Sequence, residues 1–135
     1  LLPLCREEGL GVLSYNLLAG GLLSGKHSRD QPPSTQTRFG STGAATLYRE
    51  RYWNDAAFDA VEELSAVARR LDVTLPVLAA AWVLHQETVT SAIVGATRVE
   101  QLEAPVTALG TSLEPDVLEE LDRITRRFRE GDAVQ

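Results

Sequence analysis

The sequence places one group of residues where they could bind a phosphate. Residues 91–103 begin with a β-branched run, reach Gly95, and then open a predicted helix with Thr97, Arg98 and Glu100. Thr97 and Glu100 have the spacing of a capping box, in which each side chain bonds the other residue's backbone N–H. Arg98 in the first turn opposes the helix dipole unless an anion lies nearby, and a phosphate would reverse that sign. The spacing alone favours the plainer interpretation, a capped surface helix with an incidental arginine.

A second candidate ligand-binding segment follows a short apolar stretch near the start of the sequence. Residues 16–26 contain Gly20, Gly21 and Gly25 and end at Lys26. Glycine lets a backbone approach a ligand closely, and the carboxyl end of a strand is where α/β folds bind their ligands. The same residues also fit a glycine-rich turn without a ligand, with the lysine in solvent.

An aromatic and basic helix is the third candidate. Tyr48 and Arg51 lie three residues apart, so one helical face presents both side chains. Together they could hold a carboxylate or an aromatic substrate. The alternative is a packing face, in which the rings and guanidinium groups cover other elements of the fold.

The remaining reactive residue types indicate no catalytic or metal site. His27 and His85 lack metal-ligating partners, and Cys5 lacks neighbours that would activate its thiol. The acidic side chains between residues 55 and 63 fit a solvated helix face. We therefore expect neither a metal ion nor a catalytic group in this sequence.

Two short strands and a set of helices must position the candidate groups. Residues 10–15 and 89–94 have the apolar content of buried strands, and residues 27–45 form a long polar connection. Two strands separated by helices favour parallel β/α units. The nearly all-apolar helix at 75–84 should be buried against a sheet, which needs more strands than two. Periodicity and capping signals predict helices at residues 1–8, 46–53, 54–71, 74–86, 98–109 and 115–129.

Three of these helices have a recognisable N-terminal cap. The candidates are Thr46 for the first, Asn54 or Asp55 for the second and Thr74 for the third. In the second, Phe58, Val61 and Leu64 repeat at helical spacing and should form its buried face.

Composition narrows the class of protein. A 44% hydrophobic content and a net charge of −6 describe a globular domain and argue against a nucleic-acid or anionic-membrane partner. No apolar run approaches the ~20 residues of a membrane span. The one cysteine leaves no internal disulfide, which fits a reducing compartment. The sequence begins Leu-Leu-Pro and contains no Met, which indicates a piece of a longer protein.

Taken together and in this order, the segments resemble the C-terminal part of the aldo-keto reductases. Residues 13–26 are similar to the family's seventh strand and the loop after it, and residues 92–103 to its eighth strand and cofactor helix. The Arg-Phe pair at 38–39 and the aromatic helix at 48–53 are most similar to the aflatoxin-aldehyde reductase branch. The potassium-channel β-subunit branch is a more distant relative.

The resemblance implies a fold and a cofactor. The sequence would form the C-terminal portion of a (β/α)8 TIM barrel: the last two strands, their following helices and the C-terminal helix. It would be one partial oxidoreductase domain over residues 1–135, lacking the N-terminal barrel half, with NADP(H) at the C-terminal face. The sequence departs from the family at Leu17, where proline is usual, and at Pro105, where asparagine is usual. The second departure leaves no amide for the family's adenine contact.

The same resemblance implies roles for individual residues. Thr97 and Arg98 would face the 2′-phosphate of the cofactor, and Tyr48 and Arg51 would bind the substrate. The family's catalytic Asp, Tyr, Lys and His belong to its first four strands, and no residue here matches them. The full set of expected cofactor-binding residues is Tyr15, Asn16, Leu18, Ala19, Gly20, Lys26, Gly95, Thr97, Arg98 and Gln101.

The expected function is that of a fragment of an NADPH-dependent, cytoplasmic aldo-keto reductase that reduces aldehydes or ketones to alcohols. The fragment would carry the cofactor clamp but not the catalytic tetrad, so we expect it to be inactive and weakly folded by itself. Its main partner would be the missing barrel half, and a homo-oligomer is left open. The alternative is a non-catalytic module that binds a nucleotide or a protein, or one subunit of a split barrel.

Overall fold

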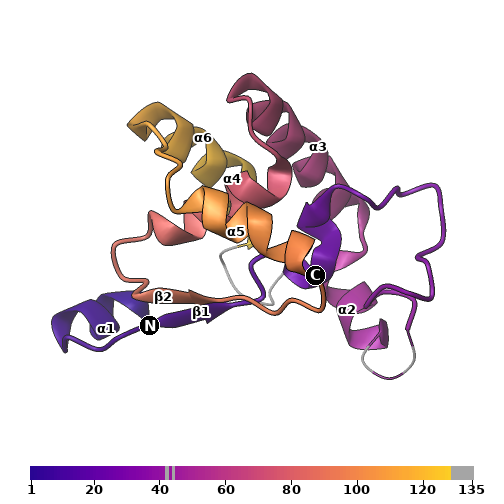
Figure 1. Cartoon of the computed structure of the whole chain (residues 1–135), viewed down its shortest axis with the longest axis horizontal. Helices are drawn as coiled ribbons and strands as arrows, with labels where there is room; N and C mark the ends of the chain where they lie inside the picture. Colours follow the sequence, from indigo (N-terminus) through magenta and orange to yellow (C-terminus); the bar gives the residue numbers. More distant parts are fainter. Residues whose placement is uncertain (42, 44, 129–135) are drawn as a thin grey trace.

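The computed structural model describes residues 1–41, 43 and 45–128. Two parallel strands and a layer of helices make up this part of the protein (Figure 1). In sequence order the elements are α1 (Leu2–Glu7), β1 (Leu13–Tyr15), η1 (Ala19–Ser24), α2 (Ala45–Tyr52), α3 (Asp55–Arg70), α4 (Leu75–Leu84), β2 (Ser91–Ile93), η2 (Val99–Leu102), α5 (Glu103–Ala108), α6 (Pro115–Thr125) and η3 (Arg126–Phe128), where η marks a 3-10 helix.

The two strands pair in parallel, as the order of elements predicts. Leu13 lies opposite Ser91 and Tyr15 opposite Ile93. In Figure 1 the strands run side by side along the lower edge, and α3 to α6 all lie on one side of them. The sheet therefore has one face covered by helices and one bare face.

The strands are shorter than predicted, and the prediction that they are buried is wrong. Leu13 is 62% exposed, Tyr15 76% and Ile93 53%. Side chains alternate between the two faces of a strand, so these three lie on one face, while the half-buried Ser14 and Ala92 lie on the other. The exposure follows because a two-stranded sheet buries only the face that its helices cover.

The hydrophobic core lies among the helices. Phe39, Val67, Leu78 and Leu121 are its largest fully buried side chains. The apolar helix α4 is buried mainly by other helices, with α3 and α5 packed against it. Packing against other helices, in addition to the sheet, buries this apolar helix within the described part of the chain.

The capping signals predict some helix starts correctly and miss others. Asn54 caps α3, because its side chain accepts a hydrogen bond of 2.9 Å from the backbone N–H of Ala57. Thr46 does not cap α2, which begins one residue earlier. Thr74 holds the N-cap position of α4 but makes no capping hydrogen bond, and Pro76 occupies the first turn. The end predicted for the last helix, residue 129, lies outside the described residues, and α6 gives way to η3 before it.

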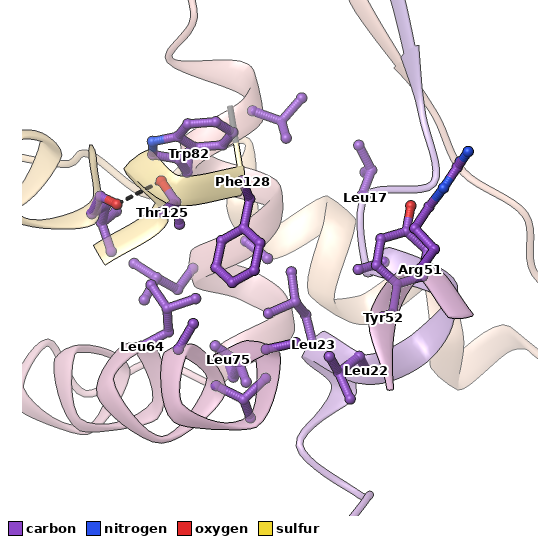
Figure 2. A pocket seen from close by; sticks show the side chains of 18 of the residues that line it. Leu17, Leu22, Leu23, Arg51, Tyr52, Leu64, Leu75, Trp82, Thr125 and Phe128 are labelled. Atoms are coloured by element: carbon purple, nitrogen blue, oxygen red, sulfur yellow. Dashed lines mark hydrogen bonds between the residues drawn. The ribbon is translucent and has the colours of Figure 1, made fainter. Parts of the chain in front are cut away.

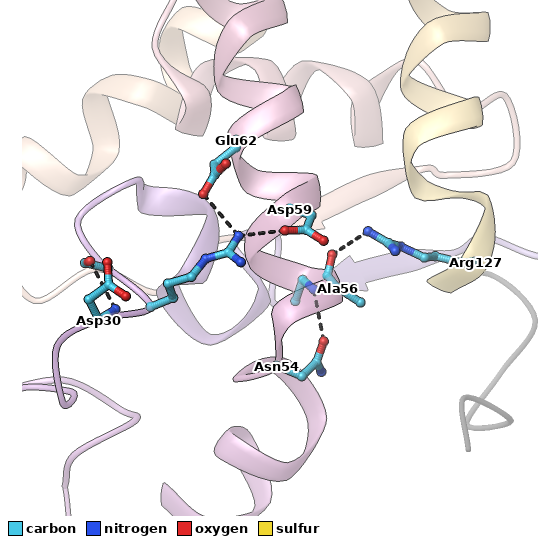
Figure 3. A network of polar contacts seen from close by, with 9 residues as sticks. Asp30, Asn54, Ala56, Asp59, Glu62 and Arg127 are labelled. Carbon is cyan, nitrogen blue, oxygen red and sulfur yellow. Dashed lines mark hydrogen bonds and ion pairs between the residues drawn. The ribbon is translucent and has the colours of Figure 1, made fainter.

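Polar contacts fasten the long 27–41 connection and η3 to the start of α3 (Figure 3). The Arg29 guanidinium bonds the carboxylates of Asp59 at 2.6 Å and Glu62 at 3.1 Å. Arg127 donates to the carbonyl oxygen of Ala56 at 2.6 Å. Both arginines are exposed and therefore link segments far apart in the sequence from the surface of the protein.

In the part of the chain that the structure describes, none of the helices has the length and apolarity to cross a membrane.

Candidate cofactor-binding site

The parallel register brings two of the predicted ligand-binding segments to one end of the sheet. The chain leaves β1 into Asn16 and the η1 turn, and it leaves β2 into Val94 and Gly95. Parallel strands in register end at the same edge, and this edge is where α/β proteins bind ligands. Segments about 80 residues apart in the sequence thus start from neighbouring points.

Asn16 organises the first segment. Its backbone has a φ of 62°, a left-handed conformation that asparagine tolerates better than most residues. Its Oδ1 accepts a hydrogen bond of 2.8 Å from the N–H of Gly20, and its Nδ2 donates to the Tyr52 hydroxyl at 3.1 Å. The side chain therefore shapes the η1 turn and ties it to α2.

Gly20 is required by packing. It is buried, with a φ of 71°, and a Cβ there would lie 2.6 Å from Cδ1 of Tyr48. The Tyr48 ring fills the space beside Gly20, so packing alone already requires a glycine here, and the contact of its backbone with a ligand stays a prediction. Gly21, with a φ of 107°, and Gly25, with a φ of 73°, have ordinary space around the missing Cβ.

The other predicted residues of this segment differ in exposure. Tyr15 lies exposed on the bare face at the end of β1, and Lys26 is exposed beyond η1. Leu18 and Ala19 are half-buried. Ala19 has a φ of 47°, a conformation that costs energy in a residue with a Cβ. The η1 turn is thus a strained backbone held by Asn16 and Tyr48.

The capping box predicted in the second segment is absent. The 3-10 helix η2 begins after Arg98, which has extended backbone angles and makes no capping hydrogen bond. The N–H of Thr97 donates instead to Oε1 of Gln101 at 2.7 Å, and the Thr97 hydroxyl lies 3.4 Å from the same oxygen. Glu100 has no part in this arrangement because the helix starts after Arg98 and not after Thr97, so Gln101 occupies the third helical position, from which a side chain reaches back to the helix start. The side chain of Gln101 therefore fixes Thr97 beside Arg98.

Arg98 is the cationic side chain of the second segment. It is exposed, and within the described residues its guanidinium makes no ion pair or hydrogen bond, while its backbone carbonyl accepts from the N–H of Gln101. The space around Gly95 is open, with no atom within 4 Å of where a Cβ would lie. An anion could therefore reach the guanidinium without displacing a partner recorded in this part of the chain.

The third predicted group separates into two environments. Arg51 lines an apolar groove of about 810 Å³ between η1, α2, α3, α4 and α6, at the end near Leu17 and Tyr52 (Figure 2). Tyr48 packs against Gly20, and its ring centroid lies 6.3 Å from that of Phe39. The Arg38 guanidinium lies 5.8 Å from the centre of the Tyr48 ring. The two side chains do not line the same cavity in the described residues.

Two structural features of the candidate site escaped the sequence reasoning. Tyr52 holds Asn16, and the signal for it is its spacing of four residues from Tyr48, which puts both rings on one face of α2. His27 lies in an aromatic cluster with Phe39 and Trp53. No local pattern reveals that cluster, because its members come from distant segments.

Among the described residues no group of three or more His, Cys, Asp or Glu could hold a metal ion.

Comparison of the fold identifies the architecture. The structure is similar to the glycerol dehydrogenase of Gluconobacter oxydans, with a TM-score of 0.75 and 24% identity. The match covers 97% of this chain and 38% of that one. The described elements are therefore part of a (β/α)8 barrel, as the resemblance predicts.

The sequence comparison identifies the family. The model of the aldo/keto reductase family matches residues 1–126. The chain belongs to this family.

The relatives are longer proteins. The NADH-specific methylglyoxal reductase of Escherichia coli (strain K12) is 36% identical, over 84% of this chain and 33% of its own length. The aflatoxin B1 aldehyde reductase member 2 of Mus musculus is 33% identical, over 91% of this chain and 37% of its own length. The probable voltage-gated potassium channel subunit beta of Arabidopsis thaliana is 34% identical, with 91% and 38% covered. The chain thus spans little more than a third of these relatives, and the aflatoxin-aldehyde branch is among them.

Proposed function

We propose that this chain forms the cofactor-binding part of an NADPH-dependent aldo-keto reductase that reduces an aldehyde or ketone to an alcohol. The observation that carries the proposal is the parallel register of β1 and β2, which starts both candidate segments from one edge of the sheet. Membership of the aldo/keto reductase family supports the reaction class. The bound nicotinamide would supply the hydride that reduces the carbonyl carbon.

The residues present fit such a cofactor in charge and in space. Arg98 is exposed beside an open Gly95, and Lys26 is exposed at the end of the other segment. Two exposed cations, one on each of the segments that follow the strands, suit the phosphates of a dinucleotide. Tyr15, an exposed ring on the bare face, suits a flat nicotinamide. Asn16, Leu18, Ala19 and Gly20 would form the turn that the cofactor lies along, with Thr97 and Gln101 beside Arg98.

The chain's own residues would bind and orient the cofactor, and the proton donor for the nascent alkoxide would come from the rest of the barrel. Asn16 holds the η1 turn in a single shape before any ligand arrives. Such preorganisation lowers the entropy lost on binding. We propose that the rest of the barrel covers the bare face around Leu13 and leaves Tyr15, at the end of β1, open to the cofactor. We also propose a cytoplasmic location, in keeping with the one cysteine of the sequence.

The preference for NADPH over NADH rests on Arg98, and one relative is named for NADH, so the preference needs its own test. In the whole barrel, Arg98→Ala should weaken NADPH binding by about tenfold to a hundredfold, because a hydrogen bond to a charged group contributes roughly 1.5–3 kcal/mol. NADH lacks the 2′-phosphate and should bind with nearly unchanged affinity. Calorimetric titration with both cofactors measures the ratio.

Arg69→Ala is the matched control for this experiment. Arg69 is an exposed arginine in the last turn of α3, so its loss changes the net charge equally. It should leave both affinities unchanged. Equal losses of NADPH and NADH affinity in Arg98→Ala would remove the assignment of this residue to the 2′-phosphate.

The substrate proposal rests on Arg51 at the end of the apolar groove, with Tyr48 beside the η1 turn. A guanidinium near an apolar surface suits an aldehyde that carries a carboxylate. Arg51→Ala should therefore raise the KM for carboxylated aldehydes, such as succinic semialdehyde, more than for neutral ones. Steady-state kinetics with a carboxylated and a neutral aldehyde of equal length checks this. An unchanged preference would show that Arg51 does not bind the substrate.

A further inference from the structure

His27 joins three segments of the candidate site. It directly follows Lys26, and its ring makes edge contacts with Phe39, at 5.1 Å between centroids, and with Trp53, at 5.3 Å. Its Nε2 faces the η1 turn, since a Cβ on Gly21 would lie 4.0 Å from that atom. The imidazole therefore wedges between the η1 turn, the 27–41 connection and the junction of α2 with α3.

The His27 ring belongs to an aromatic cluster that holds the whole 27–41 connection in place. Phe39 is completely buried, and the centroid of its ring lies 5.0 Å from that of Trp53. Trp53 in turn contacts Phe58 of α3 at 5.1 Å. The aromatic cluster of His27, Phe39, Trp53 and Phe58 thus anchors both ends of the connection to the helical core. Removal of one ring would loosen the anchor at the end next to Lys26.

The space that the His27 ring occupies, between Phe39, Trp53 and the η1 turn, suits a neutral imidazole and not a cation. The Nε2 atom is buried and has no hydrogen-bond partner among the described residues. Burial, and then the positive charge of Lys26, lower the pKa of His27 below 6.5. Its recorded ring neighbours, Phe39 and Trp53, carry no charge.

The charged side chains on the surrounding elements offer the imidazolium no recorded partner. On the 27–41 connection, Arg29 bonds Asp59 and Glu62. Asp30 and Arg38 belong to the same connection, and the Arg38 guanidinium lies 5.8 Å from the Tyr48 ring centre. The neighbouring α2 carries Arg49, Glu50 and Arg51. None of these residues makes a recorded ion pair with His27 in the described part of the chain.

We propose that neutral His27 locks the η1 turn and the 27–41 connection together, and that protonation of His27 expels the ring and releases both. The lock positions Lys26 and the turn for the cofactor, so that acid weakens cofactor binding. This second consequence rests on the proposed function, whereas the first does not.

The direction of the pH effect follows from proton linkage. Once the ring is expelled into solvent, the pKa of His27 returns to near 6.5, so the unlocked form binds more protons than the locked form in the window just below that value. The free energy of unlocking therefore rises with pH through this window and is level above it. The lock is fully formed above about pH 6.5 and is lost as the pH falls.

Histidine NMR tests the lock directly. The whole protein, labelled with ¹³C on its histidine rings, is titrated from pH 8 to about 5, around the ordinary histidine pKa. His27→Phe assigns the His27 signal, keeps an aromatic ring in the slot and removes the charge. His27→Leu serves as a second variant should the first fail to fold. His85→Gln controls for the other histidine, whose two ring nitrogens both have recorded backbone partners.

We expect the pKa of His27 to lie below 6.5 and the backbone amides of Gly21 and Phe39 to shift with the same midpoint. In His27→Phe these amides should not titrate. A pKa of 6.5 or higher, or amides that ignore the titration, would overturn the proposal.

Cofactor affinity tests the second consequence. NADP⁺ affinity is measured at pH 7.5 and about 5.5 for the wild type and for His27→Phe. The 2′-phosphate itself titrates near pH 6, and the variant shares that titration, so the difference between the two proteins isolates the imidazole. The wild type should lose more affinity, by up to about tenfold for each unit by which the pKa of His27 is lowered. Equal losses would overturn this part. Absence of NADP⁺ binding at any pH would refute the proposed function and leave the NMR result standing.

Discussion

The helical layer and the two-stranded sheet of this chain differ in what surrounds them. Leu78 and Leu121, in the helical layer, are completely enclosed by other helices. Leu13 and Ile93, on the sheet, have more than half of their surface exposed. Both regions are apolar in sequence, so apolar content alone does not tell a satisfied core from an interface. The helices are packed by the chain itself, whereas one face of the sheet lies exposed.

The same contrast separates structure from proposed function. The residues that hold the fold, such as Phe39 and Asn54, have their contacts within the chain. Those proposed to bind the cofactor, such as Tyr15 at the end of β1 and Arg98 beyond the end of β2, lie exposed. Substitutions in the two groups should therefore affect different measurements.

The largest expected effect comes from a matched pair of leucines. In the 135-residue chain, Leu121→Ala should lower the free energy of unfolding by about 2–5 kcal/mol, because it leaves a cavity in a close-packed core. Leu13→Ala should change it by less than about 0.5 kcal/mol, since the side chain already faces solvent. Urea denaturation followed by circular dichroism compares the two. Equal losses would show that the sheet is covered in solution, which would erase the contrast between the regions.

A second pair of variants separates packing from backbone strain. Gly20→Ala should destabilise the protein by roughly 2–3 kcal/mol, the sum of a left-handed backbone and a clash with Tyr48. Gly9→Ala, with a similar φ of 64° and open space, should cost only about 1 kcal/mol. Thermal melting of both variants measures the difference. If the two variants melt alike, Tyr48 does not confine the η1 turn.

The smallest expected effect concerns the helix caps. Asn54→Ala removes a capping hydrogen bond and should cost about 1 kcal/mol. Thr74→Ala removes a side chain that makes no such bond and should cost a few tenths of that. Chemical denaturation of the two variants distinguishes them. A larger loss from Thr74→Ala would mean that α4 depends on a cap absent from this structure.

Local signals predict the parts of the fold that local physics controls. The apolar repeat of Phe58, Val61 and Leu64 places the buried face of α3 correctly, and Asn54 marks its start. The order of strands and helices predicts the parallel pairing. The exposure of Leu13 and Tyr15 could not be predicted in this way, since it depends on which face of the sheet the helices cover, and no local pattern encodes that.

The candidate site also divides into features that the local sequence predicts and features that it does not. The sequence identifies the segments that meet at the sheet edge, because each follows a recognisable strand. It assigns the wrong partner to Thr97, since whether residue 100 or 101 reaches back depends on the residue at which η2 starts. It also misses the cluster around His27, whose rings come together only through long-range packing.

Amide chemical-shift mapping with NADP⁺ tests the central claim most directly. The whole barrel, labelled with ¹⁵N, is titrated with NADP⁺ and, separately, with NAD⁺. We predict that both cofactors shift the amides of residues 15–26, and that NADP⁺ alone strongly shifts Thr97, Arg98 and Gln101. Shifts confined to the apolar groove, or the same response of Arg98 to both cofactors, would contradict the account.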